Sequence, residues 1–320
     1  MKTFALLIAI GLLALASVAA PGAPALAQAR AADPEGALND ELIVRARAPG
    51  PAWWKAGDGA STVWILGVPT GLSKDVAWND TPLQARLKQA HVLILPPEAK
   101  IGPLRAIAFF LGHRKAFRSP QPLEQTLPAP LAERFAAVRE KLGKPASRYA
   151  GWRPAVAAVI LSGDLRAQAR LRQGEPEDHI RALGRQAGVR EQPAGSFGPA
   201  MLQALVDLPD NAHRQCLEDS VDEAEAGAGR IVEAGRGWAA GDVRAALGVE
   251  RGFDRCLAAL PEVSALILQG QGDSAAAIKD ALAKPGVSVA VVELRSLLAK
   301  GGVIDRLRAD GVHIETPDRD

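Results

Sequence analysis

The sequence has little cysteine, little histidine and no excess of charge of either sign. Among 320 residues there are 2 Cys and 5 His, which leaves little material for a disulfide-dense scaffold or a metal cluster. The 38 Lys and Arg residues against 36 Asp and Glu give a formal net charge of +2. No surplus of cations is available to neutralise phosphates, so we expect no nucleic-acid partner. The GxGxxG, Walker, HExxH, GxSxG and CxxC patterns are also absent, which argues against the common nucleotide-binding, zincin and serine-hydrolase sites.

The N-terminus has the features of a secretory signal peptide. Lys2 is followed by an apolar run over residues 4–20, and the small-x-small tripeptides at 25–27 and 27–29 match the pattern read by signal peptidase. We expect cleavage of residues 1–27, which leaves no stable transmembrane anchor. The alternative is an uncleaved anchor, but the run is near the lower limit of roughly 20 apolar residues that span a bilayer. The mature protein is therefore expected to be periplasmic or secreted.

An oxidising compartment changes what the two cysteines can do. Cys216 and Cys256 form an even pair, which allows a single disulfide. Both lie in helix-like stretches, and two buried free thiols that act as small apolar side chains are an equally good interpretation. The sequence does not supply the Cα–Cα separation of roughly 4.4–6.8 Å that a bridge requires. Both alternatives stay open at this point.

One domain is expected to follow a flexible linker. Residues 28–50 are rich in Ala, Pro and acidic residues and are predicted to form the linker, with a single domain over residues 51–320. Asp58-Gly59 lies between two apolar runs and predicts a hairpin, because glycine accepts the positive φ of tight turns. Short apolar runs bounded by breakers predict buried strands. The predicted strands are 62–66, 91–95, 264–268, 287–292 and 312–315, and predicted helices are 81–89, 274–283 with Ser274 as N-cap, and 303–309.

The middle of the chain is predicted to be helical, because its apolar residues recur with the period of a helix face. This pattern includes Leu131, Phe135, Val138, Leu142, the stretch from Trp152 to Leu161, and Leu202, Leu205, Val206, Leu217 and Val221. Acidic residues beside the last two are predicted to form a solvated helix face; they are Asp219, Asp222, Glu223 and Glu225. Strand–helix–strand order near the C-terminus favours parallel pairing. The predicted fold is α/β, a mixed β-sheet core formed by the N- and C-terminal parts with a large helical middle section.

The order and spacing of several motifs resemble the TraB/GumN family, which is related to the Tiki and PrgY proteins. The opening Pro51-Ala52-Trp53-Trp54-Lys55 and the strand ending at Gly67 resemble the start of that family. Gly151-Trp152-Arg153-Pro154 resembles its Pro-Trp segment, Arg251-Gly252 its Arg-Asn pair, and residues 301–315 its last helix and strand. The resemblance covers about Pro51 to Thr316. It implies a pocket of the kind found in metal-dependent peptidases or related hydrolases.

The chain departs from the family pattern at the residues that would carry this chemistry. Thr70 stands where the family has the histidine of its first Gly-x-x-His, and Ser296 where it has the second. Glu98 comes one or two residues late for the acidic position after the second strand, and the Arg-Asn pair keeps only Arg251. Threonine and serine are poor ligands for a divalent cation and cannot act as bases at neutral pH. The resemblance therefore implies a degenerate pocket that comprises Gly67, Thr70, Glu98, Arg251, Glu293 and Ser296.

Three functional hypotheses follow from this pocket. The first is an exported pseudoenzyme that binds a ligand or an envelope partner and needs no cofactor. The second is a hydrolase or peptidase with a rebuilt or metal-dependent site, which uses Glu98 and Glu293 together with Ser296 or Thr70. The third is a purely structural envelope protein without a ligand. The two carboxylates could form a polar pocket with Arg251 at the carboxyl ends of strands, or only structural ion pairs.

The histidines offer no obvious ligand set. His91 and His313 are expected at strand edges or in hydrogen-bonded positions, and His113 and His179 are expected to be exposed. His213 follows Asp210-Asn211 and could cap a helix. No two histidines have the spacing that places ligands on one helix face. We therefore expect no metal site built on histidine.

Overall fold

The computed structural model describes residues 32–46, 49–57, 60–100, 102–172, 174–198, 203–204, 206–249 and 251–317. The predicted signal peptide, the Asp58-Gly59 turn, Leu202 and Leu205 lie outside these described residues. The signal peptide and the turn thus stay predictions. No helix of the described residues is long and apolar enough to cross a membrane.

A mixed sheet of six strands forms the core of the fold, in the order β10-β1-β2-β9-β4-β7. β1 pairs with β2 and β10 in antiparallel fashion, whereas β9 is parallel to both β2 and β4, and β4 is parallel to β7. The strands are β1 (Trp53–Gly57), β2 (Ser61–Val68), β4 (Ala90–Leu95), β7 (Arg190–Pro193), β9 (Gly286–Glu293) and β10 (Ile314–Glu315). The predicted α/β fold with a mixed sheet from both ends of the chain is confirmed. Two short sheets pair β3 (Leu72–Ser73) with β6 (Leu171–Arg172) and β5 (Glu98–Ala99) with β8 (Ser196–Phe197).

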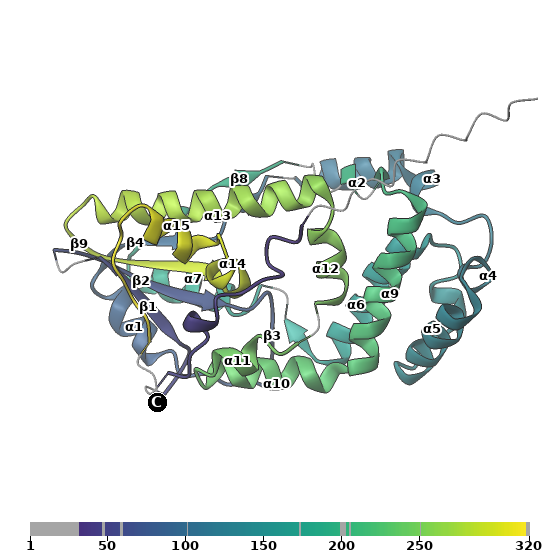
Figure 1. The fold of residues 1–320 in the computed structure, drawn as a ribbon, viewed down its shortest axis with the longest axis horizontal. Coiled ribbons are helices and arrows are strands. Elements are labelled where there is room, and N and C mark those ends of the chain that lie inside the picture. Colours follow the sequence, from purple (N-terminus) through teal and green to yellow (C-terminus); the bar gives the residue numbers. More distant parts are fainter. Residues whose placement is uncertain are drawn as a thin grey trace, which may run out of the picture.

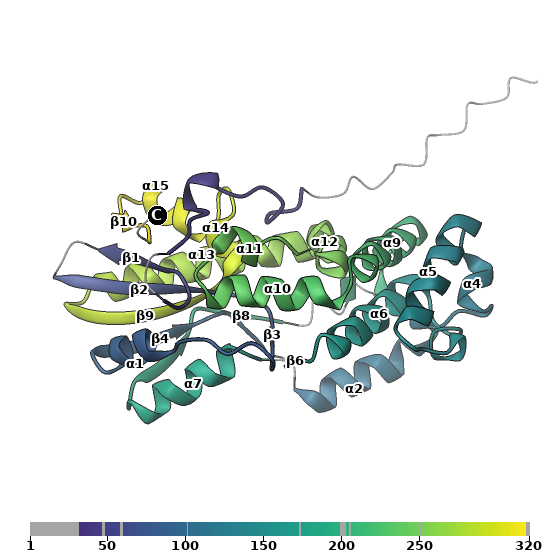
Figure 2. The same cartoon turned by 90° about the horizontal axis from the view of Figure 1, so that it is seen from below.

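The central strands are buried because helices cover both faces of the sheet. Figure 2 shows α1 and α7 on one side and α13, α14 and α15 on the other. A parallel strand with helices on both faces needs a nearly continuous apolar run, and residues 289–292 of β9 are all buried. These helices are α1 (Thr81–Leu87), α7 (Glu177–Gln186), α13 (Pro261–Leu282), α14 (Leu294–Leu298) and α15 (Val303–Ala309). Two further helices, α10 (Ala228–Ala239) and α11 (Val243–Ala246), pack near β3 and the N-terminal segment.

A second apolar core lies in the helical part of the molecule, on the right of Figure 1. Phe135, Leu161 and Leu217 are fully buried there, as the helical periodicity predicts. The helices of this part are α4 (Leu123–Thr126), α5 (Ala129–Lys141), α6 (Pro154–Gln168), α9 (Asp210–Ala226) and α12 (Gly252–Ala258), and α2 (Pro103–Gly112) and α3 (Arg114–Phe117) lie beside it. Two single 3-10 turns complete the elements, η1 (Asp40–Leu42) and η2 (Ala146–Arg148).

The predicted strand at 264–268 is wrong, because these residues lie inside the 22-residue helix α13. Pro261 in the first turn supplies a φ that suits a helix start and lacks the N–H that would be unpaired there. Ser274 is therefore in the middle of a helix and not its N-cap. Its Oγ donates to the Gly270 carbonyl at 2.8 Å, the bond to the preceding turn that serine makes within helices.

Much of the predicted linker is packed onto the domain. Leu42 is fully buried and Val44 is 5% exposed, and both belong to the main apolar core. Isolated β-bridges join Leu38 to Ala299 and Arg45 to Asp242. The linker was predicted from the content of Ala, Pro and acidic residues, which does not reveal these apolar contacts. The contacts bind residues 32–46 to the C-terminal part of the chain.

Cys216 and Cys256 form a disulfide, which decides between the two alternatives that the sequence left open. Their Cα atoms are 5.1 Å apart and the bridge links α9 to α12 across a separation of 40 residues. Closing a loop of this length in the unfolded chain is worth about 4 kcal/mol in the chain-entropy description. The bridge thus fixes α12, and with it the residue at its N-cap, Arg251.

Candidate functional site

The two segments that replace the Gly-x-x-His motifs begin at the same edge of the main sheet. β2 and β9 are parallel neighbours, and Val68 is the register partner of Glu293. Gly67 is therefore next to the end of β9, and Leu294 and Leu297 of α14 lie against it. Ligands of α/β proteins usually bind at the carboxyl ends of parallel strands, so this edge is the first place to look for a site.

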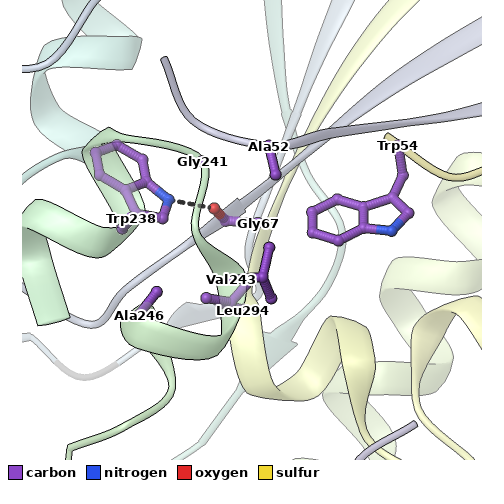
Figure 3. Close-up of a pocket in the computed structure, with 8 residues that line it drawn as sticks. All are labelled: Ala52, Trp54, Gly67, Trp238, Gly241, Val243, Ala246 and Leu294. Atoms are coloured by element: carbon purple, nitrogen blue, oxygen red, sulfur yellow. Dashed lines mark hydrogen bonds between the residues drawn. The ribbon is translucent and has the colours of Figure 1, made fainter. Parts of the chain in front are cut away.

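The apolar side of this edge is filled. A Cβ on Gly67 would lie 2.5 Å from Leu294 Cδ1, so glycine permits the close packing of α14 on β2. Trp238 Nε1 donates to the Gly67 carbonyl at 2.7 Å (Figure 3). The remaining pocket has a cavity volume of about 0 Å³ and is lined by Ala52, Trp54, Gly67, Trp238, Gly241, Val243, Ala246 and Leu294. This is below the size of ordinary small-molecule sites, which start near 300 Å³.

The polar side of the edge holds a cluster of five residues, which we name the Arg251 cluster: Asp33, Glu35, Arg251, Glu293 and Ser296. Arg251 donates from Nη1 to Asp33 and from Nη2 to Glu35 Oε2 at 2.9 Å. Ser296 Oγ donates to the other Glu35 oxygen at 2.5 Å. The side chains of Asp33, Glu35 and Arg251 are 18%, 13% and 11% exposed. The carboxylates of Asp33 and Glu35, both in the N-terminal segment, thus bind the guanidinium of Arg251 and the hydroxyl group of Ser296.

Glu293 ends β9 and caps α14. Its Oε2 accepts the backbone N–H of Ser296 at 2.7 Å. Removal from water raises the pKa of Glu293 to about 8, and the negative charge of Glu35 adds to this effect. Arg295 lies beside it and donates to the Leu247 carbonyl at 2.8 Å; burial lowers the pKa of this guanidinium. At neutral pH the Glu293 carboxyl therefore carries a proton for most of the time.

Gly252 stands directly after Arg251, where the family resemblance leads us to expect an asparagine. Its φ is +42°, and a Cβ there would lie 2.8 Å from Glu223 Cβ and closer still to the carboxylate. Burial raises the pKa of Glu223 to about 7. Glu223 thus takes the space that a side chain after Arg251 would need.

Besides Gly67, on the apolar side of the edge, two of the predicted pocket residues lie outside the Arg251 cluster. Thr70 is exposed and follows the end of β2 by two residues. Glu98 lies in β5, and its Oε1 accepts from Arg181 Nη2 at 2.7 Å; Arg181 also binds Glu177 and Glu191. The contacts found for Glu98 are thus those of a structural ion pair, one of the two alternatives. They do not include Arg251 or Glu293.

Comparison with known proteins gives a match at the level of a family. The model of the TraB/PrgY/gumN family matches residues 52–316. The chain belongs to the TraB/PrgY/gumN family. No curated protein and no solved structure matches it. The family match begins after Asp33 and Glu35, so the two carboxylates on Arg251 come from a segment that precedes the TraB/PrgY/gumN match.

The acidic cluster on α9 is only partly the solvated face that its charge predicts. Asp222 and Glu225 bind Arg134 Nη2 at 2.6 and 2.7 Å at the surface. Asp219 and Glu223, however, are buried. They face α12, where Arg255 Nη2 donates to Asp219 Oδ1 at 2.8 Å. Of the acidic residues on α9, Asp222 and Glu225 thus lie at the surface, whereas Asp219 and Glu223 lie in the contact between α9 and α12.

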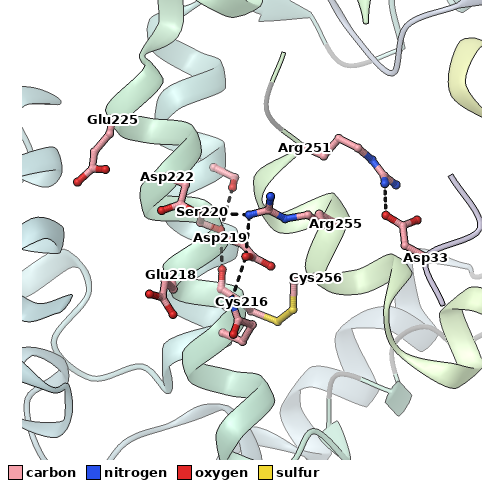
Figure 4. A network of polar contacts seen from close by, with 12 residues as sticks. Asp33, Cys216, Glu218, Asp219, Ser220, Asp222, Glu225, Arg251, Arg255 and Cys256 are labelled. Atoms are coloured by element: carbon pink, nitrogen blue, oxygen red, sulfur yellow. Dashed lines mark hydrogen bonds and ion pairs between the residues drawn. A yellow bond between two sulfur atoms is a disulfide. The ribbon is translucent and has the colours of Figure 1, made fainter. Parts of the chain in front are cut away.

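An open groove of about 750 Å³ adjoins the Arg251 cluster between α9 and α12 (Figure 4). It is lined by Asp33, Gln215, Glu218, Asp219, Asp222, Arg255 and Ala259. Asp33 belongs to both the groove and the cluster, and Figure 4 shows its carboxylate directed at Arg251. The volume of the groove is within the range of ligand sites. A ligand in the groove could therefore reach Arg251 if Asp33 moved aside.

The histidines of this TraB/PrgY/gumN chain are dispersed. His91 Nε2 lies 3.3 Å from Ser288 Oγ, a hydrogen-bonded position at the strand edge as predicted. His113 and His179, expected to be exposed, are both partly exposed, and the His179 side chain is 40% exposed. His113 Nδ1 contacts the Phe109 carbonyl, and His179 Nε2 lies 2.7 Å from Asp80 Oδ2. The backbone carbonyl of His313 accepts from Gly57. Among the described residues, no group of three or more His, Cys, Asp or Glu side chains is placed to hold a metal ion.

His213 does cap a helix, although not its own. It is 2% exposed, and its Nδ1 accepts the backbone N–H of Ala155, in the first turn of α6, at 3.4 Å. Burial lowers the pKa of His213 to about 4, so the ring is neutral at pH 7. A neutral ring can accept the helix N–H, which a protonated ring could not.

Sequence reasoning missed Asp33 and Glu35, the residues that complete the cluster. Both lie in the stretch assigned to the linker, where acidic residues seemed to need no partner. The only available signal was the pair of apolar residues at Leu42 and Val44, which is unusual for a disordered segment.

Proposed function

We propose that this TraB/PrgY/gumN protein is an exported, catalytically degenerate member that binds a carboxylate-bearing ligand or envelope partner at the Arg251 cluster. The observation that carries the proposal is the pair of carboxylates that Arg251 and Ser296 already bind. Asp33 and Glu35 precede the family match, and a ligand with carboxylates in their place would use the same donors of Arg251 and Ser296.

The chemistry of the cluster favours recognition over hydrolysis. A guanidinium with several donors and a neighbouring hydroxyl are suited to bind carboxylates. Thr70 and Ser296, at the positions of the expected histidines, are poor ligands for a divalent cation. These features support a site that holds an anion in place.

One observation favours the alternative of a rebuilt hydrolase. The pKa of Glu293 near 8 allows its carboxyl to donate a proton at neutral pH, as a general acid must. Its partners are a backbone N–H and the charge of Glu35, however, and Glu98 is bound to Arg181. The rebuilt hydrolase would therefore depend on Glu293 and Ser296 alone, without Glu98 as its second carboxylate.

A calorimetric titration tests the proposed binding site. The double variant Asp33→Ala, Glu35→Ala of the mature chain removes both carboxylates that bind Arg251 and Ser296. We call it the emptied variant. The probe is the peptide Ala-Ala-Asp-Pro-Glu-Gly-Ala, which has the sequence of residues 31–37. We expect the emptied variant to bind it at least tenfold more tightly than the unmodified chain, because a tethered segment competes at an effective concentration on the order of millimolar.

The matched control removes two acidic residues from the same segment that do not contact Arg251. Asp40→Ala, Glu41→Ala makes the same change of charge within η1, and should bind the peptide as weakly as the unmodified chain. Adding Arg251→Gln to the emptied variant should abolish binding. Equal affinities of the emptied variant and the unmodified chain would contradict the proposal.

A further inference from the structure

Helix α2 exposes an apolar surface that the rest of the described chain leaves uncovered. Leu104, Ile107, Phe110 and Leu111 are 81%, 56%, 47% and 70% exposed. We name these four residues the α2 patch. Single exposed apolar residues are common, but four large ones on one short helix form a contiguous patch of the kind that marks an interaction site.

The α2 patch is one face of the helix. Its residues follow the i, i+3, i+7 spacing that brings side chains to one side of a helix. The helix turns its smaller or partly buried side, with Ala106 and Phe109, toward the protein. The Phe109 ring is 4.2 Å from that of His113, and the Phe110 ring is 5.4 Å from that of Phe117 on α3. Leu104, Ile107 and Leu111 are thus the most outward members of the α2 patch.

The stretch of sequence that holds the α2 patch carries basic residues and no acidic ones. From Ala99 to Leu123 the sequence has no Asp or Glu, in a chain that is otherwise close to charge balance. The basic residues in this stretch are Lys100, Arg105, Arg114, Lys115 and Arg118. Positive charges are unfavourable near the start of a helix, so helix stability does not explain Arg105 in the first turn of α2.

We propose that the α2 patch docks on an anionic lipid surface, with α2 lying flat in the interface. An exposed apolar helix face flanked by Lys and Arg is the arrangement that binds anionic membranes, because apolar side chains enter the acyl boundary and cations contact the headgroups. With 10 residues, α2 is about 15 Å long, far too short to span a bilayer of about 30 Å. Figure 2 shows α2 at the margin of the molecule, away from the sheet and free to approach a plane.

A second copy of the chain fits this surface less well. In a two-fold symmetric dimer the same patch lies on both subunits. Such a contact would bring the two cationic stretches together without an acidic partner from either one. Anionic headgroups neutralise the same cations, so charge complementarity selects the membrane.

Vesicle co-sedimentation of the mature chain tests this proposal. We expect binding to vesicles of equimolar phosphatidylcholine and phosphatidylglycerol, and little binding to phosphatidylcholine alone. Ile107→Ser, Leu111→Ser should weaken binding at least tenfold, and Arg114→Gln, Lys115→Gln about tenfold or more, because each basic residue near an anionic surface contributes about a fivefold gain. The control Lys284→Gln, Lys300→Gln removes the same charge from exposed positions elsewhere and should bind as the unmodified chain.

Thermal unfolding separates docking from a structural role. Because Ile107 and Leu111 are exposed, their replacement by serine should leave the unfolding temperature unchanged while it weakens vesicle binding. Absence of binding to anionic vesicles, or binding that neither double variant weakens, would overturn the proposal. A concentration-dependent dimer in light scattering that Ile107→Ser, Leu111→Ser dissolves would also overturn it, because a second copy would then cover the patch.

Discussion

Arg251→Gln should lower the free energy of unfolding by about 3 kcal/mol at pH 7, the lower end of the range for breaking a buried ion pair. The substitution leaves Asp33 and Glu35 without their counter-charge, and both carboxylates are less than one-fifth exposed. It also releases the N-terminal segment from α12. Urea unfolding followed by circular dichroism measures the change, with the midpoint and the slope determined separately.

Arg134→Gln is the matched control for this prediction. Arg134 also binds two carboxylates, Asp222 and Glu225, but at the surface, where its side chain is 36% exposed. Exposed ion pairs contribute at most about 1 kcal/mol, so this variant should remain close to the unmodified protein. Equal losses of stability in both variants would mean that the Arg251 cluster is an ordinary surface ion pair.

The free energy of unfolding should fall as the pH rises from 6.5 to 8. The pKa values of Glu293 and Glu223 are raised to about 8 and about 7 in the folded protein, against about 4.3 in an unfolded chain. In this window the folded state binds more protons than the unfolded state, so stability decreases with pH. The expected loss is on the order of 2 kcal/mol. His213 acts in the opposite sense, but only below pH 6.5, because burial lowers its pKa to about 4.

Removal of the two titrating groups tests the origin of this slope. Glu293→Gln should remove the larger part of the decrease throughout this window, and Glu223→Gln the smaller part. Glu262→Gln, on the exposed side of α13, should leave the slope as it is. The measurement is urea unfolding at half-unit steps of pH. A stability that is constant or rises from pH 6.5 to 8 would show that neither carboxyl is protonated in the folded protein.

The parts of the fold that could be predicted from the sequence are those in which local pattern and burial agree. The apolar run at 287–292 became the central strand β9, and the periodicity of Leu131, Phe135 and Val138 became the buried face of α5. The run at 264–268 failed because a short apolar run fits a buried helix as well as a strand, and Pro261 decided for the helix.

The candidate site was harder to predict, because its members come from distant parts of the chain. The family resemblance expects Arg251, Glu293 and Ser296 in one pocket, and in the structure all three lie near Glu35. It could not supply Asp33 and Glu35, which lie outside the matched residues, nor show that Glu98 binds Arg181. A contact between residues 33 and 251 depends on how the N-terminal segment crosses the domain, and no local pattern in the sequence encodes that path.

We propose that the Arg251 cluster binds carboxylates, whereas the family resemblance implies a metal-dependent pocket at this place. The most direct test of this proposal is the metal content of the mature chain after incubation with zinc, manganese and cobalt and removal of free ions by gel filtration. Because Thr70 and Ser296 are poor ligands for a divalent cation, elemental analysis should find each metal well below one equivalent per chain. One equivalent of any of these metals, lost in Glu293→Gln, would contradict the account.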